Sequence, residues 1–201
     1  VISSGNKLPE PVFLDDQHNW MPLLSIEDDG LRIFEPEKDG LDFYESIESM
    51  VVGIRQGIVV DATNTYDEII VLPSTLVPSN LISRSGALLI SKQDSNPEKV
   101  MVKLFGSAQG DIQVSDVIDQ PLLGVMTYSF GHYKINTFQG VETIQSDYFP
   151  LQFKASSEGL TLATYNVENL SLDDGESKFN TLAIQILEEL GSPDILALHE
   201  V

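Results

Sequence analysis

The last ten residues of the sequence, SPDILALHEV at positions 192–201, decide how its C-terminal part folds. An apolar run, Ile195 to Leu198, follows Pro193 and predicts a buried β-strand. The run is followed by His199 and Glu200, so this strand carries an acid to its carboxyl end. Because buried strands of this kind lie inside domains, we expect the chain to end within a second domain.

A strand and a helix are predicted ahead of this run. Residues 160–166, LTLATYN, predict the strand, and a polar loop follows it. Apolar residues then recur at spacings of three and four between Ser177 and Leu190, which predicts an amphipathic helix. Gly191 suits the C-terminal cap of that helix. Strand, helix and strand in this length predict a right-handed βαβ unit with parallel strands, and one such unit is too small to bury its own faces.

Residues 41–155 predict an all-β domain. Its strand candidates are short, rich in β-branched residues and bounded by turn signals. The clearest candidates are Met50–Ile54, Gly57–Val60, Glu68–Leu72, Ala87–Ser91, Lys99–Leu104 and Leu123–Phe138. This pattern fits a small OB-like Greek-key barrel in a mainly β chain. Residues 1–40, which hold four prolines, predict an irregular N-terminal arm.

Composition narrows the function classes. The chain has no cysteine, which excludes disulfides, thiolate metal sites and cysteine nucleophiles. No apolar run approaches the roughly 20 residues that cross a membrane. The net charge is −20, and each predicted region is acidic, so the chain has no basic footprint for tight nucleic-acid binding. This charge favours solubility, and the alternative is that some acids bind divalent cations.

Aspartate-rich turns are the first place to look for such cation ligands. The candidates are Asp15–Asp16, Asp28–Asp29–Gly30 and Asp173–Asp174–Gly175. None of them has EF-hand spacing. We therefore interpret them as ordinary turns.

Asn166 and Glu200 are the candidate site residues of the βαβ unit. Functional groups collect at the carboxyl ends of parallel strands, where both residues are predicted to lie. A carboxylate there can hold Mg²⁺, which takes one or two carboxylates and keeps several waters. An amide beside it can orient a phosphate oxygen or a ligand side chain. The alternative is that Asn166 caps a loop and that Glu200 is simply solvated.

This C-terminal segment resembles the opening of the endonuclease/exonuclease/phosphatase family. That family begins with a strand ending in Asn, a helix, and a strand of the form PDI-x-x-L-Q-E-V. The matching residues here are TYNVENL at 164–170, Lys178–Phe179 and SPDILALHEV. The resemblance implies that Asn166 is an active-site asparagine and that Glu200 ligates Mg²⁺, or Ca²⁺ or Mn²⁺. His199 departs from the pattern, because the family usually has Gln there.

A narrower resemblance, to large bacterial secreted or surface nucleases, spans most of residues 8–201. The segments that carry it are LPEPV at 8–12, DFYESIESMVV at 42–52, Thr63–Leu72, NPEKV at 96–100 and GVMTYSFGHYK at 124–134. It departs at Ser49, where Gly is more usual, and in the stretch 87–95. It implies an extracellular or cell-surface hydrolase of nucleic-acid phosphodiesters with an OB-type domain ahead of the catalytic domain. Residues 156–201 would then be the truncated start of a four-layer α+β catalytic domain.

The resemblance also implies what this chain lacks. In the family, Mg²⁺ stabilises charge while a His–Asp pair, encoded far downstream, activates water. The three histidines present, His18, His132 and His199, stand in other contexts. We therefore expect the chain to be inactive by itself and to bind no metal tightly. The alternative is a structural or ligand-binding β module, for a partner protein, a glycan or single-stranded nucleic acid, attached to another phosphoesterase. An exposed βαβ stub can also self-associate.

Tyr128, Phe130, His132 and Lys134 are the candidate nucleic-acid contacts of the β domain. Together with Met126 they alternate along one predicted strand, so we expect them to share one face. OB domains stack bases on such aromatics and follow phosphates with Lys or Arg. The alternative, which the surrounding negative charge favours, is that Met126, Tyr128 and Phe130 fill the core.

Overall fold

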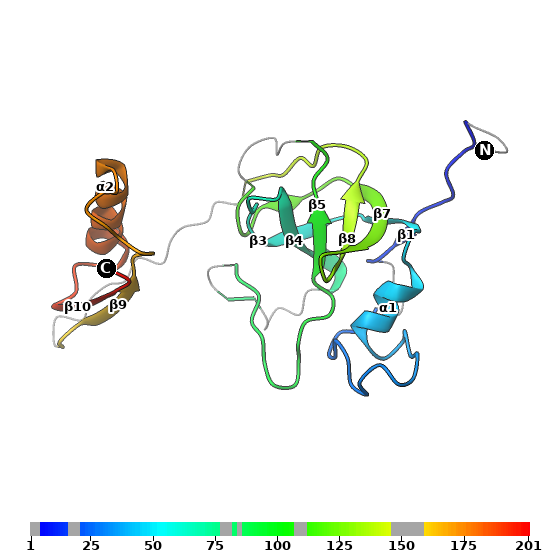
Figure 1. Ribbon diagram of the computed structural model, residues 1–201, viewed down its shortest axis with the longest axis horizontal. Coiled ribbons are helices and arrows are strands. Elements are labelled where there is room, and N and C mark those ends of the chain that lie inside the picture. Colours follow the sequence, from blue (N-terminus) through cyan, green and yellow to red (C-terminus); the bar gives the residue numbers. More distant parts are fainter. Residues whose placement is uncertain (1–4, 16–20, 77–81, 84–85, 107–111, 146–158) are drawn as a thin grey trace. The chain divides into compact units, whose positions relative to one another are not determined.

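The structure is a computed structural model of the whole chain. It describes all residues except 1–4, 16–20, 77–81, 84–85, 107–111 and 146–158 (Figure 1). The chain divides into two compact units, Val1–Tyr148 and Phe149–Val201. The boundary predicted between 155 and 156 falls outside the described residues.

The first unit is built on one mixed eight-stranded sheet. Its strands are β1 (Val12–Phe13), β2 (Val51–Ile54), β3 (Gly57–Asp61), β4 (Glu68–Pro73), β5 (Val100–Lys103), β6 (Val117–Ile118), β7 (Leu122–Ser129) and β8 (His132–Thr137). The order is β1-β2-β7-β8-β5-β4-β3-β6, with parallel pairing only at β1–β2 and β5–β8. The prediction of a mainly β chain is confirmed. Among the described strands, β1 and β6 are edges and the ladder is not closed into a barrel.

Alternating burial along the strands creates the core of this unit. Val59, Val102 and Met126 are each 0% exposed, while their neighbours along the strands are at least partly exposed. A short helix, α1 (Gly40–Ser46), adds Phe43 and Tyr44 to the same core. The side chain of Asp39 caps this helix by accepting a hydrogen bond from the backbone N–H of Asp42 at 3.0 Å.

Strands β2 and β3 are separated only by Arg55 and Gln56 but pair with different neighbours. β2 pairs with β7, whereas β3 pairs with β4 on the other side of the strand order. Both strands need a glycine. A Cβ at Gly53 would lie 2.6 Å from Leu123 Cδ2, and a Cβ at Gly57 would lie 2.4 Å from Val71 Cγ1. One nearly continuous segment thus serves both halves of the sheet.

Two strand predictions for the first unit were wrong. The predicted strand Leu123–Phe138 is a hairpin, because Phe130 and Gly131 turn the chain between β7 and β8. Both turn residues have positive φ, +52° and +83°, as a two-residue type I′ hairpin loop requires. The predicted strand Ala87–Ser91 is absent, and the structure has only an isolated bridge between Ile82 and Leu88 there.

The second unit contains the predicted strand, helix and strand. These are β9 (Leu162–Asn166), α2 (Glu176–Ile184) with a π-helical turn η2 (Gln185–Glu189), and β10 (Ile195–His199). β9 and β10 are parallel, as predicted, and pair in register from Leu162↔Ile195 to Asn166↔His199. None of the helices in the described ranges has the length and apolar character needed to cross a membrane.

Candidate functional site

Asn166 and Glu200 meet at the carboxyl ends of β9 and β10. The strand register pairs Asn166 with His199, so Glu200 is the next residue beyond the last pair. Asn166 Nδ2 donates a hydrogen bond to Glu200 Oε1 at 2.7 Å. Both side chains are exposed. The structure therefore brings together the two residues predicted to share a site.

The amide of Asn166 has two partners at once. Its Oδ1 accepts a hydrogen bond from the backbone N–H of Glu168 at 2.8 Å, while its Nδ2 bonds to Glu200. The sequence left open whether Asn166 caps a loop or faces the glutamate, and it does both. Because the acceptor end holds the loop, the donor end is fixed in its direction toward the carboxylate.

The backbone around the pair is tightly constrained. Glu168, Asn169 and Glu200 have φ values of +56°, +53° and +60°, a left-handed conformation that non-glycine residues seldom adopt. Two backbone bonds hold it in place, from Val167 N to His199 O at 3.0 Å and from Leu170 N to Glu200 O at 2.8 Å. Such a conformation persists only where its surroundings over-determine it.

A hollow opens beside Asn166 between β9 and α2. Its lining residues include Asn166, Glu168, Lys178, Thr181 and Gln185. Lys178 Nζ donates to Glu168 O at 2.9 Å and lies 3.2 Å from Asp174 Oδ2. This lysine places one positive charge at the rim of the hollow, next to the loop that follows β9.

The oxygen donors of this pair fit a magnesium ion in part. Mg²⁺ takes one or two carboxylates and keeps several waters, and Glu200 offers one exposed carboxylate. The carbonyl oxygen of Asn166 already accepts from Glu168 N. Among the described residues, no group of three or more acidic or histidine side chains includes Glu200. Glu200 is therefore the residue here that would hold the ion, and Asn166 is the residue that would position it.

The hairpin that joins β7 and β8 carries the other candidates. Tyr128 is 54% exposed, Phe130 at the turn is 97% exposed, and His132 is exposed. Met126 is fully buried, so core packing holds for Met126 and not for the two aromatics. Because the turn interrupts the strand, these residues do not alternate along a single strand as predicted. The ring of Tyr128 lies against Tyr133, with centroids 4.8 Å apart.

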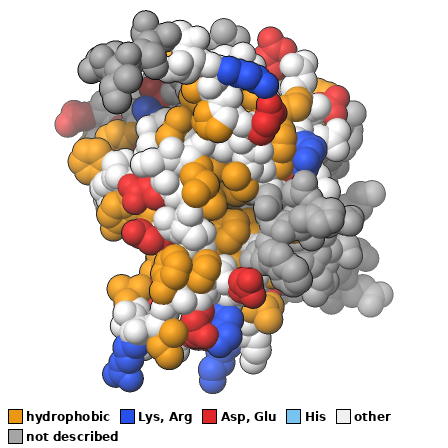
Figure 2. Space-filling view, turned by 90° about the vertical axis from the view of Figure 1, so that its right-hand side faces the viewer, with side chains coloured by type: hydrophobic (Ala, Val, Ile, Leu, Met, Phe, Trp, Pro, Cys, Tyr) orange, Lys and Arg blue, Asp and Glu red, His pale blue; other side chains and the backbone are white. Residues whose placement is uncertain are grey.

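Lys134 lies in the interior. Its side chain is 6% exposed, and its Nζ lies 2.6 Å from Oε1 of Glu68, which is itself 14% exposed. This ion pair leaves Lys134 unable to follow a phosphate chain. On the face drawn in Figure 2, Lys and Arg side chains lie singly among acidic and apolar ones. The hairpin therefore offers no exposed lysine to a phosphate, because Lys134, the lysine of its sequence, is buried and paired with Glu68.

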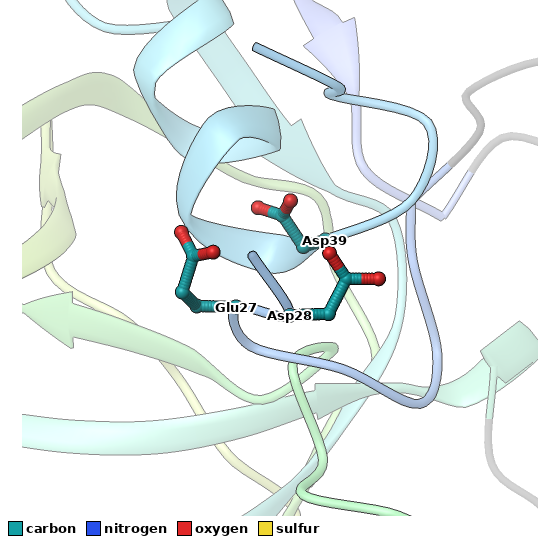
Figure 3. A group of neighbouring side chains, drawn as sticks. All are labelled: Glu27, Asp28 and Asp39. Atoms are coloured by element: carbon teal, nitrogen blue, oxygen red, sulfur yellow. The ribbon is translucent and has the colours of Figure 1, made fainter. Parts of the chain in front are cut away.

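Sequence reasoning missed an acidic cluster in the N-terminal arm. Glu27, Asp28 and Asp39 each place a carboxylate oxygen within 4.8 Å of the others (Figure 3). Burial raises the pKa of Asp39 above its ordinary value, and the nearby acids raise it further. Glu27 Oε1 accepts the backbone N–H groups of Asp29 and Gly30, both at 2.8 Å, which is the turn that the sequence suggested. Asp39 is held in the cluster because it caps α1. It lies 11 residues from Asp28 in the sequence, so no local pattern indicated the cluster.

Residues 1–146 match a family model described as a domain of unknown function, DUF8508. The chain belongs to the DUF8508 family. The matched DUF8508 region ends two residues before the last residue of the first compact unit, Tyr148. It therefore covers the large sheet and excludes Asn166 and Glu200. No curated protein matches the chain. No solved structure matches it either.

The buried ion pair of the DUF8508 unit is expected to be sensitive to the loss of one partner. Lys134→Met leaves Glu68 charged and buried, so we expect the free energy of unfolding to fall by about 3–5 kcal/mol. Urea denaturation followed by circular dichroism measures this change. The control is Lys103→Met, on the neighbouring strand β5. The Lys103 side chain is 38% exposed, and its Nζ donates to Tyr66 O and lies 3.8 Å from Asp67 Oδ2. Its loss should cost at most about 1 kcal/mol. Equal effects of the two variants would contradict the role of Lys134.

The same pair predicts a dependence of stability on pH. The hydrogen bond from Lys134 lowers the pKa of Glu68 in the folded state. The stability from this pair is therefore present above the unfolded pKa of about 4.3 and is lost as the pH falls through the folded pKa. We expect the destabilisation by Lys134→Met to be largest near pH 7 and to shrink in acid. Urea denaturation at a series of pH values checks this, and a constant difference between the two proteins would refute it.

Proposed function

We propose that this chain is the N-terminal part of a Mg²⁺-dependent nuclease of the endonuclease/exonuclease/phosphatase family, secreted or displayed at the surface of a bacterium. The observation that carries the proposal is the 2.7 Å hydrogen bond between Asn166 Nδ2 and Glu200 Oε1 at the carboxyl ends of two parallel strands. In this proposal the second unit begins the α+β catalytic domain. The DUF8508 unit precedes it and positions or captures the nucleic acid.

Glu200 is the residue proposed to hold Mg²⁺. When bound, the ion supplies stabilisation of the negative charge that develops on the phosphodiester oxygens. Asn166 bonds to Oε1 of the glutamate, so Oε2 is the oxygen that would hold the ion. The loop bond to Glu168 N prevents the amide from turning away. The side chains of this site are thus oriented before any substrate arrives.

Exposed apolar side chains support the idea that the second unit belongs to a larger domain. Leu162 is 69% exposed on β9, Ile195 and Leu198 are 49% and 42% exposed on β10, and Leu187 in η2 is 61% exposed. Among the described residues of this unit, Val167 is the buried hydrophobic one. A sheet and a helix with such surfaces need a further layer, which the rest of a catalytic domain would provide.

We further propose that the DUF8508 unit is an OB-type barrel. Five-stranded OB domains are partly open Greek-key barrels. In this chain β3, β4 and β5 form an antiparallel meander, and β8 then pairs with β5 in parallel and with β7 in antiparallel fashion. The segment 51–61 contributes β2 to one side of this row and β3 to the other. Because β2 and β3 are consecutive in the chain but lie on opposite sides of the row, they would bring the two sides together, and this supports a barrel.

Loss of the glutamate should abolish the activity of the protein that carries this chain together with the rest of the proposed catalytic domain. We expect Glu200→Gln to lower Mg²⁺-dependent cleavage of supercoiled plasmid by about 100-fold or more, because the variant loses the charge that holds the ion. Asn166→Ala should lower the affinity for Mg²⁺ by about 10–100-fold, because a metal ligand loses the partner that positions it. Glu189→Gln, an exposed glutamate of the same unit, serves as the matched control. Full activity of Glu200→Gln would exclude the proposed role, and assays on RNA and on phospholipid head groups would define the substrate.

The 201-residue chain alone is expected to leave plasmid DNA intact in the presence of Mg²⁺. The proposed site has one carboxylate and one amide, and no His–carboxylate hydrogen bond is present beside it in the described residues. Gel electrophoresis of plasmid incubated with the chain checks this. Chelator-sensitive nicking that persists through repeated purification would contradict the expectation. Size-exclusion chromatography of the same sample reports whether the exposed βαβ stub pairs with a second copy.

The second candidate function is a ligand-binding β module, and it is favoured by the 97% exposure of Phe130 at the hairpin turn. Tyr128 of the same hairpin is 54% exposed, and exposed apolar side chains that form a patch are typical of an interaction site. The partners considered are a protein, a glycan or single-stranded nucleic acid. The buried position of Lys134 and the net charge of −20 argue against the last of these.

Titration with an oligothymidine at low salt tests the nucleic-acid option. We expect no quenching of tyrosine fluorescence, because phosphates would meet acidic rather than basic side chains near the hairpin. Phe130→Ser is the comparison variant, since Phe130 is too exposed to support the core. Binding that weakens with salt and disappears in Phe130→Ser would establish the stacking surface instead.

A further inference from the structure

Four buried side-chain oxygens among the described residues have no hydrogen-bond partner. They are Glu27 Oε2, Asp29 Oδ2, Asn96 Oδ1 and Glu98 Oε2. All four are acceptors on carboxylates or an amide, and leaving such groups unpaired costs free energy. The missing component in each case is therefore a donor or a positive charge.

These oxygens come from two segments that are bonded to each other. Ser95 N and Ser95 Oγ both donate to Leu24 O, at 3.0 Å and 2.9 Å. Ile26 N donates in turn to Ser95 Oγ at 3.2 Å. The residues with unpaired acceptors thus belong to two segments, the N-terminal arm and the loop ahead of β5, that are joined through Ser95.

Asn96 and Glu98 have the most deeply buried of these oxygens. Their side chains are 3% and 1% exposed. The amide orientation of Asn96 is settled, because its Nδ2 donates to Leu89 O at 2.9 Å and Oδ1 must be the unpaired atom. Asp94 stands at the same turn, where its Oδ1 accepts the backbone N–H of Asn96 at 3.0 Å. Burial of Glu98 raises the pKa of its carboxyl, and the negative charge of Asp94 raises it further.

We propose that Asp94, Asn96 and Glu98 form a binding site for a divalent cation with oxygen ligands, of which Ca²⁺ fits best. The sequence DSNPE at 94–98 offers oxygen ligands at alternate positions, as the first ligands of calcium loops do. Two carboxylates balance the charge of the ion, and Asn96 adds a neutral oxygen. Ca²⁺ accepts six to eight oxygens in flexible geometry, whereas Mg²⁺ demands a near-ideal octahedron, so an irregular loop favours Ca²⁺.

The site has a structural consequence because the loop packs on α1. Tyr44 Oη bonds to Pro97 O at 3.0 Å and to Lys99 O at 3.2 Å. A Cβ at Gly40 would lie 2.7 Å from Pro97 Cβ, so the helix start and the loop are in close contact. A cation held at Glu98 therefore ties the arm and α1 to the sheet and stabilises the folded DUF8508 unit.

The acidic cluster of Glu27, Asp28 and Asp39 is the competing location and serves as the comparison. Some of its oxygens are already in use, since Glu27 Oε1 accepts two backbone N–H groups and Asp39 caps α1, while Glu27 Oε2 has no partner. Asp28 is exposed. The unpaired oxygens of Asn96 and Glu98 differ in that both residues are almost fully buried, whereas Glu27 is only partly buried.

The test uses the full chain, stripped of metal with a chelator and then titrated with CaCl₂ or MgCl₂. We expect millimolar Ca²⁺ to raise the melting temperature by about 5 °C, and Mg²⁺ to raise it less. Tb³⁺, a luminescent substitute for Ca²⁺, should emit on excitation of tyrosine, because Tyr44 contacts the loop. Added Ca²⁺ should displace this signal.

Variants locate the ion. Glu98→Gln keeps the shape of the side chain and should abolish both responses, and Asp94→Asn should weaken them. Glu27→Gln and Glu200→Gln should leave them unchanged, and the latter separates this site from the one proposed for catalysis. The proposal fails if the wild-type chain shows no Ca²⁺ response. It also fails if Glu27→Gln, rather than Glu98→Gln, removes the response. A third contrary result is that Ca²⁺ has no effect and Glu98→Gln raises the melting temperature, which would identify Glu98 as a neutral buried carboxyl.

Discussion

The register between β9 and β10 is the constraint on which the proposed catalytic site depends. Because these strands are parallel and pair from Leu162↔Ile195 to Asn166↔His199, their polar ends arrive at the same edge. Side chains alternate along a strand, so a slip of one residue would turn the opposite set toward the same face and would carry Glu200 away from Asn166. The bonds from Val167 N to His199 O and from Leu170 N to Glu200 O extend this register past the strands themselves. The left-handed backbone at Glu200 is a consequence, since it lets the carbonyl keep its loop partner while the carboxylate turns to the amide.

In the DUF8508 unit the corresponding constraint is the parallel pair β5–β8, which buries a charge. The register places Lys134 beside Met101, and the lysine reaches Glu68 on β4 from there. Charges are rarely buried unless they are paired. The pairing fixes the relation of three neighbouring strands, and it withdraws from the surface the one lysine that the hairpin sequence offers to a phosphate. The aromatic residues of the hairpin are exposed, but no exposed lysine of the hairpin accompanies them. The ion pair that orders the sheet therefore weakens the case for a nucleic-acid surface.

The sequence predicted those features that depend on local periodicity. Apolar runs and helical spacing identified β9, α2 and β10, and the carboxyl-end rule then selected Asn166 and Glu200. It could not predict the hairpin at Phe130–Gly131, because the alternation of apolar and polar residues continues through the turn and conceals it. The burial of Lys134 could not be predicted for another reason, because its partner Glu68 lies 66 residues away in the chain. The oxygens of Asn96 and Glu98 were overlooked because their burial is created by contacts with the arm and α1 that no local pattern encodes.

Asparagine at position 166 satisfies two demands that other short side chains cannot meet together. The loop needs an acceptor for Glu168 N, and Glu200 needs a donor to hold its carboxylate. Aspartate would supply the acceptor but would face Glu200 with a like charge, which opposes ionisation of both groups. Serine has a single oxygen atom, and its shorter side chain would have to serve both partners from one position. An amide separates the two functions onto different atoms, so it can hold the loop and the glutamate at once. This division of roles is the physical reason why Asn166 can cap the loop and, in the proposed site, also position Glu200.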